Sequence, residues 1–240
     1  MDTVYAGASI TGQSHEETGQ ENQDSFCITR YGFGMVMVVA DGLGTKKHSK
    51  IGSKEVCKAV GEATKVWIKK QNTPTEYLIK LIHNVWDLYI YPYKKNDCAT
   101  TCLFSIVLNN GRVILGQLGD GIIYYNNGEN LNVLTEIEDE FLNITKSMSS
   151  AKSICEWKFK EISLTDQDFT LLMTTDGLSE DIIKEKRQDF MNYILKQIES
   201  KKRQSKKNLV IKKILKSTNS KYSYDDKTLI IFNRKGKTGE

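Results

Sequence analysis

The sequence predicts an α+β fold in which two antiparallel β-sheets face each other and helices cover their outer sides, giving four layers in the order αββα. Three observations predict it. Short apolar runs end at glycine–carboxylate or Asn–Gly turns, which is typical of buried strands joined by tight turns. Other segments repeat their apolar residues at helical spacing. The helical segments are inserted between groups of strands, an order that favours separate helix and sheet layers.

Strands are predicted where an apolar run stops at a turn. Met35–Ala40 leads into Asp41-Gly42, and Thr101–Leu108 ends at Asn109-Asn110-Gly111, a hairpin signal. In chain order the predicted strands are Met35–Ala40, Thr101–Leu108, Arg112–Leu118, Ile122–Tyr125, Phe169–Thr174 and Thr228–Phe232.

Helices are predicted where apolar residues return every three or four positions. In the first helical segment Val56, Val60 and Trp67 share one face, and Pro74 follows its end, while Pro92 ends the second segment. The predicted helices are Ser49–Gln71, Thr75–Tyr91, Ile182–Ser200 and Lys207–Ser217.

Composition is that of a soluble globular chain. The 240 residues are 39% hydrophobic and 27% charged, with two prolines and no Gly/Ser-rich linker, so we expect residues 1–240 to form one domain. No apolar run reaches the roughly 18 residues that cross a bilayer, and Met1–Ile10 does not resemble a secretory signal. The five cysteines lack zinc-site spacing. We therefore expect a cytoplasmic protein with reduced thiols and no membrane partner.

The charge is unevenly distributed. Residues 184–216 carry twelve Lys or Arg against three Asp or Glu, so a basic helical segment at about 184–217 accompanies an acidic remainder. A solvated helix face explains this pattern, and a docking surface for an acidic partner or nucleic acid is the alternative. Nucleic acid is disfavoured because residues 201–216 show no aromatic interleaving and no nucleic-acid motif.

Carboxylates stand at the ends of several predicted strands. They are Asp41, Asp120, Asp176 and the pair Asp225-Asp226. Each alone is explained as a turn residue, because Asp bonds its own backbone. If the strand ends converge, however, the carboxylates repel one another unless cations neutralise them. Oxygen ligands of this kind suit Mg²⁺ or Mn²⁺, so the sequence predicts a divalent metal site.

Six short motifs follow one another along the chain. They are Gln20–Phe26 (QENQDSF), Val39–Gly44 (VADGLG), Thr100-Thr101, Leu118–Asp120 (LGD), Leu172–Leu178 (LMTTDGL) and Asp225–Ile231 (DDKTLII). In this order they resemble the PPM family, the type 2C metal-dependent protein serine/threonine phosphatases. The resemblance extends from about residue 5 to residue 232. The segment Gly7–Asp24 is most similar to a divergent, largely bacterial branch that has a Ser-His pair here.

The resemblance implies a function and a set of ligands. It implies hydrolysis of phosphoserine and phosphothreonine by a hydroxide that bridges two Mg²⁺ or Mn²⁺ ions, with a weaker third ion in many members. Asp41 matches the carboxylate that bridges both ions, and the Gly42 carbonyl completes the shell of the first. Asp176 and Asp225 match the ligands of the second ion.

Three further aspartates have less direct counterparts. Asp24 matches a catalytic-site carboxylate that acts through water, and Asp120 matches a ligand that shares the third ion with Asp176. Asp226 stands where asparagine is usual, so it is a weaker candidate for a metal ligand than Asp225. The partner implied is a phosphorylated protein, the substrate of a serine/threonine kinase, and we expect a monomer.

The chain departs from the family at the substrate phosphate. Most members have an arginine where this chain has Gly19, and His15, with Ser14 beside it, is the nearby candidate for that role. The surface or turn histidine is the alternative interpretation of His15. After Asp120, Gly121-Ile122 stands where Ser-Arg is usual. After Gly44, Thr45 stands where a second glycine is usual. The residues between Asp120 and Asp176 match the segment that carries a mobile flap.

Two rival functions remain open. A pseudophosphatase would use the same fold as a phosphoprotein-binding or scaffold module, and Gly19 favours it. The presence of Asp41, Asp176 and Asp225 argues against it. A basic binding protein with purely structural acidic turns is the second rival. Metal-dependent hydrolysis of p-nitrophenyl phosphate separates them.

Overall fold

The computed structural model describes residues 3–70, 73–128, 130–135, 146–218 and 223–236. In this part of the chain all strand pairs are antiparallel and form two five-stranded sheets. Sheet A has the order β1-β10-β9-β6-β7 and sheet B the order β2-β3-β4-β5-β8. The strands are β1 (Thr3–Ile10), β2 (Ser25–Tyr31), β3 (Gly34–Ala40), β4 (Cys102–Leu108), β5 (Arg112–Leu118), β6 (Ile122–Asn126), β7 (Leu131–Val133), β8 (Lys158–Ser163), β9 (Phe169–Thr174) and β10 (Lys227–Arg234).

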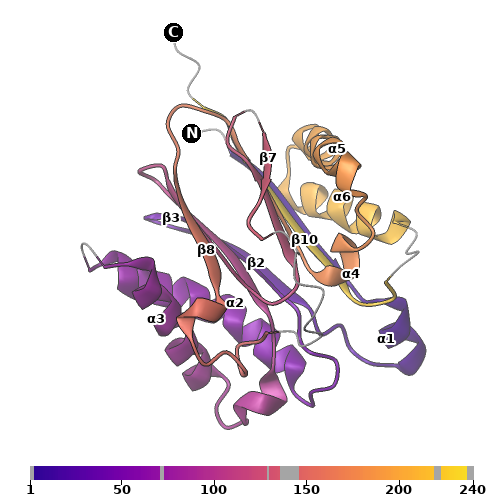
Figure 1. The fold of residues 1–240 in the computed structure, drawn as a ribbon. Coiled ribbons are helices and arrows are strands. Elements are labelled where there is room, and N and C mark those ends of the chain that lie inside the picture. Colours follow the sequence, from indigo (N-terminus) through magenta and orange to yellow (C-terminus); the bar gives the residue numbers. More distant parts are fainter. Residues whose placement is uncertain (1–2, 71–72, 129, 136–145, 219–222, 237–240) are drawn as a thin grey trace.

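Helices lie outside both sheets. Figure 1 shows α2 and α3 on one side of the sheets and α5 and α6 on the other. The α-helices are α1 (Gln13–Thr18), α2 (Ser49–Ile68), α3 (Thr75–Tyr89), α4 (Asp176–Ser179), α5 (Arg187–Glu199) and α6 (Gln204–Ser217). Short 3₁₀ turns occur at Lys95–Cys98, Ile154–Glu156 and Lys184–Lys186.

Three apolar cores separate the four layers. Alternate residues of a strand point to opposite faces of its sheet. Accordingly, Val38 packs in the core between sheet B and helices α2 and α3, whereas Met37 packs in the core between the sheets. Leu172 and Ile211 belong to the third core, between sheet A and helices α5 and α6. The predicted α+β sandwich with outer helices is confirmed.

The element boundaries differ in places from the prediction. The helix expected from Ile182 begins at Arg187, because Ile183 is exposed and residues 184–186 form a 3₁₀ turn. The helix expected from Lys207 begins at Gln204. The basic segment is therefore two helices with a break between them. No helix among the described residues is long and apolar enough to cross a bilayer. Of the segment matched to the family's flap, residues 136–145 lie outside the described residues.

Candidate metal centre

Strand register brings Asp24 and Asp41 together. Asp24 directly precedes β2 and Asp41 directly follows β3, and these antiparallel strands pair Ser25 with Ala40. The two aspartates therefore leave the same end of sheet B side by side. Asp24 is buried, with 2% of its surface exposed, and Thr175 Oγ1 donates to its Oδ2 at 2.9 Å.

Sheet A delivers the remaining aspartates to the same edge. Thr174, at the end of β9, pairs with Ile122 of β6 and with Leu229 of β10. Asp176 follows β9, and Asp225 precedes β10. Asp120 lies between β5 of sheet B and β6 of sheet A, where the chain crosses from one sheet to the other.

The carboxylates of Asp41, Asp120 and Asp176 meet in one group. Each offers an oxygen that lies within 4.8 Å of the oxygens offered by the other two. Three carboxylates at this separation repel one another strongly, and a divalent cation between them removes the repulsion. This arrangement fits a hard cation bound by oxygen ligands.

Backbone contacts fix the segment that carries Asp41. The Asp41 amide donates to Thr101 Oγ1 at 2.9 Å, and the Asp41 carbonyl accepts from the Thr101 amide and from Thr100 Oγ1, both at 2.8 Å. Gly42 is buried and forms an isolated bridge with Thr100. The Thr100-Thr101 motif thus holds the bend that follows β3. The side chains of Thr175 and Lys50 complete the frame, because Lys50 Nζ donates to the Asp24 carbonyl at 2.6 Å.

Electrostatics of the group are unfavourable without a cation. Burial raises the pKa of Asp24 to about 7. Burial, with the charges of Asp120, Asp24 and Asp225, raises the pKa of Asp176 to about 7 as well. The pKa of Asp41 lies well above its ordinary value, through burial and then through the charges of Asp24 and Asp176. The cluster therefore resists ionisation in the absence of a counter-ion.

Asp225 and Asp226 have different surroundings. Asp225 is exposed, and its charge contributes to the raised pKa values of both Asp41 and Asp176. Asp226 is buried and accepts hydrogen bonds from the Gly12 amide at 2.8 Å and the Gln23 amide at 2.6 Å. Its Oδ2 also lies 3.0 Å from Nδ1 of His15. Asp226 thus joins three chain segments. A carboxylate oxygen of Asp225 lies within 4.8 Å of ligand atoms of His15 and Asp226, in a group separate from that of Asp41, Asp120 and Asp176.

His15 lies in α1 and is buried, with 9% of its surface exposed. Its Nδ1 is engaged by Asp226. The contact of this histidine with a substrate phosphate remains a prediction, and it would have to come from Nε2.

Comparison with known proteins gives the family. A family model described as Protein phosphatase 2C matches residues 11–216. The chain belongs to the protein phosphatase 2C family. No curated protein sequence matches it.

Solved structures of this family have the same fold. A bacterial serine phosphatase is 18% identical, over 99% of this chain and 100% of that one, with a TM-score of 0.69. Stp1 from Staphylococcus aureus is 20% identical, over 98% and 96% of the two chains, with a TM-score of 0.66. The catalytic domain of PstP, in complex with two manganese ions, is 16% identical, over 96% and 97%, with a TM-score of 0.65.

Gly19, which stands where the family resemblance leads us to expect an arginine, adopts a backbone conformation that favours glycine. Gly19 ends α1 in the left-handed conformation, at φ 68° and ψ 21°. A side chain with a Cβ costs roughly 1 kcal/mol or more in that conformation. An arginine at this position would therefore be strained, and the substitution Gly19→Arg does not simply restore the usual contact.

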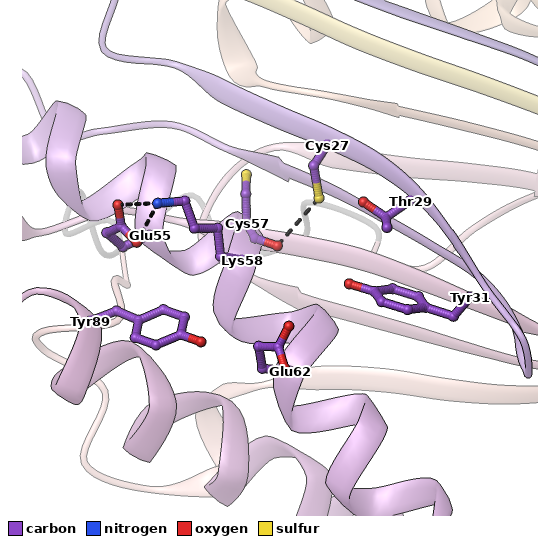
Figure 2. Close-up of a pocket in the computed structure, with 8 residues that line it drawn as sticks. All are labelled: Cys27, Thr29, Tyr31, Glu55, Cys57, Lys58, Glu62 and Tyr89. Atoms are coloured by element: carbon purple, nitrogen blue, oxygen red, sulfur yellow. Dashed lines mark hydrogen bonds and ion pairs between the residues drawn. The ribbon is translucent and has the colours of Figure 1, made fainter.

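A separate pocket of about 390 Å³ lies between β2 and α2 (Figure 2). Cys27 Sγ donates to the Cys57 carbonyl at 3.3 Å, and a hydrogen bond with Cys57 lowers the pKa of the Cys27 thiol. Lys58 pairs with Glu55 at 2.7 Å. The residues that line this pocket include none of the predicted site residues. None of the five cysteines forms a disulfide bond.

Proposed function

We propose that this chain is a metal-dependent protein serine/threonine phosphatase that hydrolyses phosphoserine and phosphothreonine monoesters. The observation that carries the proposal is the group formed by Asp41, Asp120 and Asp176, whose oxygens lie within 4.8 Å of one another. Membership of the protein phosphatase 2C family supports the same function.

Divalent cations fit the residues present. Asp24 has a buried Oδ1 that makes no hydrogen bond within the described chain, and it lies beside the raised-pKa carboxyl of Asp41. An oxygen-only donor set with excess negative charge suits Mg²⁺ or Mn²⁺. The structures of PstP with two manganese ions and of RsbX with magnesium support this choice for the family.

The proposed ligands divide between two ions. Asp41 would touch both, the Gly42 carbonyl would complete the shell of one, and Asp176 and Asp225 would hold the other. When bound, the ions supply Lewis acidity towards water and the phosphoryl oxygens. The protein fixes the carboxylates beforehand through the strand register and the Thr100-Thr101 contacts, so little reorganisation is needed.

Two aspartates have supporting roles in this proposal. Asp24, held by Thr175, would orient a water towards the ions. Asp120 would share a weaker third ion with Asp176.

His15 is proposed to bind the substrate phosphate in place of the family arginine. Its Nδ1 faces Asp226 at 3.0 Å, which would orient the ring and leave Nε2 for the phosphate. On this proposal His15→Ala raises KM for phosphopeptides about tenfold, equivalent to about 1.4 kcal/mol of binding, and leaves the metal affinity unchanged. A wild-type KM would make His15 a structural residue of α1.

The partner proposed is a phosphorylated protein, the substrate of a serine/threonine kinase, and the enzyme is proposed to act as a cytoplasmic monomer. Hydrolysis of p-nitrophenyl phosphate in Mn²⁺, and its loss in EDTA, tests the function. Binding of Mn²⁺ without hydrolysis would favour the alternative, a pseudophosphatase that binds phosphoproteins.

A further inference from the structure

A cleft of about 550 Å³ adjoins the candidate metal centre. One wall comes from the end of β1 and from α1, including Gly12 and Glu16, and another comes from α6, including Lys212 and Lys216. Asp225 also lines the cleft. Strands β9 and β10 are paired, and a Cβ at Gly177, next to Asp176, would lie 3.4 Å from the carbonyl carbon of Asp225, so the cleft opens beside the Asp176 side of the carboxylate group.

The part of the cleft wall that carries Tyr224 and Asp225 is held in place by α1. The Tyr224 carbonyl accepts from the Ser14 amide at 3.1 Å and from Ser14 Oγ at 2.9 Å. Gly12 permits this approach, because a Cβ at that position would lie 2.2 Å from the carbonyl carbon of Asp225. Tyr224 itself is 58% exposed and lines the cleft. The cleft is therefore a built feature of the fold, with an exposed aromatic ring beside the proposed ligand Asp225.

The lysines of the cleft differ in the charge they can offer. Lys227 is buried and pairs with Asp181 at 2.7 Å, so its charge is already compensated. Lys212 and Lys216 are exposed, and neither forms an ion pair with any residue that the structure describes. They are four positions apart on α6 and so lie on the same face, one turn from each other. Two carboxylates also line the cleft, Asp225 and, on the wall formed by α1, Glu16.

Only some lysines of the basic helical segment line the cleft. The exposed Lys213 of α6 does not line the cleft, although it adjoins Lys212 in the sequence. The position of the charge, rather than the overall basicity of α5 and α6, therefore distinguishes Lys212 and Lys216. This difference also provides a matched control.

We propose that Lys212 and Lys216 form a docking site for acidic residues that flank the phosphorylated serine or threonine of the substrate. The inference rests on the proposed function and names the substrate class of the same site. A phosphopeptide bound with its phosphate at the candidate metal centre would run past Asp225 and Tyr224 into the cleft. Acidic side chains on that part of the peptide would meet the two lysines, while Glu16 would disfavour a continuous acidic strip along the other wall.

The test compares the double variant K212E/K216E with K213E. Three substrates are used in Mn²⁺: a phosphothreonine peptide with glutamates on one side, the same peptide with lysines there, and p-nitrophenyl phosphate. We expect the double variant to raise KM for the acidic peptide about tenfold and to lower it for the basic peptide. Turnover of p-nitrophenyl phosphate stays unchanged, because it has no flanking residues. K213E changes each KM less than about twofold, as exposed charges outside a docking site contribute little.

Several results would overturn the docking site while leaving the proposed function intact. These are an unchanged KM in K212E/K216E, an equal rise for both peptides, or an equal effect of K213E. An unchanged KM together with lost binding of single-stranded RNA would assign the two lysines to nucleic acid instead.

If the wild-type protein fails to hydrolyse p-nitrophenyl phosphate, that result contradicts the proposed function, and the docking site needs its own test. In that case, fluorescence anisotropy of the two labelled peptides decides the docking site. Preferential binding of the acidic peptide that is lost in K212E/K216E, and kept in K213E, supports it. Equal binding of both peptides to the wild-type protein overturns it.

Discussion

Replacement of Asp41 by asparagine tests the electrostatics of the carboxylate group. In the metal-free protein, burial raises the pKa of Asp24 from 3.8 to about 7, and the pKa of Asp41 lies well above its ordinary value. Between about pH 4 and pH 7 the folded state therefore holds protons that the unfolded state has released. The free energy of unfolding consequently falls as the pH rises through this window.

The magnitude follows from the size of the shift. About three pH units, at about 1.4 kcal/mol each, amount to about 4 kcal/mol for a buried group such as Asp24. The pKa of Asp41 is raised in the same direction by burial and then by the charges of Asp24 and Asp176, so its ionisation adds to the loss of stability. The amide of Asp41→Asn carries no titrating proton. We therefore expect the variant to be more stable than the wild type at pH 8 in EDTA, because it removes one of the buried groups that must ionise there.

Urea unfolding at pH 5 to 8, in EDTA and in excess Mn²⁺, measures both effects. Mn²⁺ should stabilise the wild type strongly and Asp41→Asn only weakly, because the variant lacks the proposed bridging ligand. Asp189→Asn, at an exposed aspartate of α5, is the control for loss of one negative charge. The reasoning is refuted if Asp41→Asn is less stable than the wild type at pH 8 in EDTA, or gains as much stability from Mn²⁺.

Two further predictions concern Asp225 with Asp226, and His83. Asp225→Ala should lose most activity at saturating Mn²⁺. Asp226→Ala should mainly lower the free energy of unfolding, by about 1–3 kcal/mol, because two backbone amides lose their buried acceptor. Equal losses of activity in the two variants would show that the ligand assignment is wrong. Burial and then the charge of Lys95 lower the pKa of His83, whose neutral Nε2 accepts from Trp157 Nε1 at 3.0 Å. The unfolded state therefore binds more protons just below pH 6.5, and stability should fall as the pH drops through that range. Thermal unfolding at pH 5 to 8 should show a flatter profile for His83→Gln, and an unchanged profile would contradict this assignment.

Apolar strands were predictable from the sequence, and polar ones were not. β3 and β4 are buried along their whole length, so their composition alone marks them. β8 reads KFKEIS and is exposed at five of its six positions, as expected at the edge of a sheet, so it lacks an apolar signal. β1 and β2 were missed because polar residues or glycine interrupt their apolar residues, and the short α1 was missed because it has no apolar residue.

The candidate site likewise has features that the sequence predicts and features that it does not. Asp41, Asp120 and Asp176 each follow an apolar strand, and the structure groups their carboxylates. The contact of Thr175 with Asp24 joins residues 151 positions apart, and no local pattern predicts it. The left-handed conformation of Gly19 was likewise hidden, because the sequence gives a glycine but not its φ.

Phosphate release from a phosphothreonine peptide, measured during a Mn²⁺ titration alongside calorimetric metal binding, tests the proposed enzyme most directly. The wild type should release phosphate in step with the occupancy of two Mn²⁺ ions, and Asp41→Asn should retain less than about a tenth of that rate, since loss of a shared ligand costs several kcal/mol in the transition state. Two Mn²⁺ ions bound without phosphate release, or equal release by the variant, would contradict a metal-dependent phosphatase centred on Asp41.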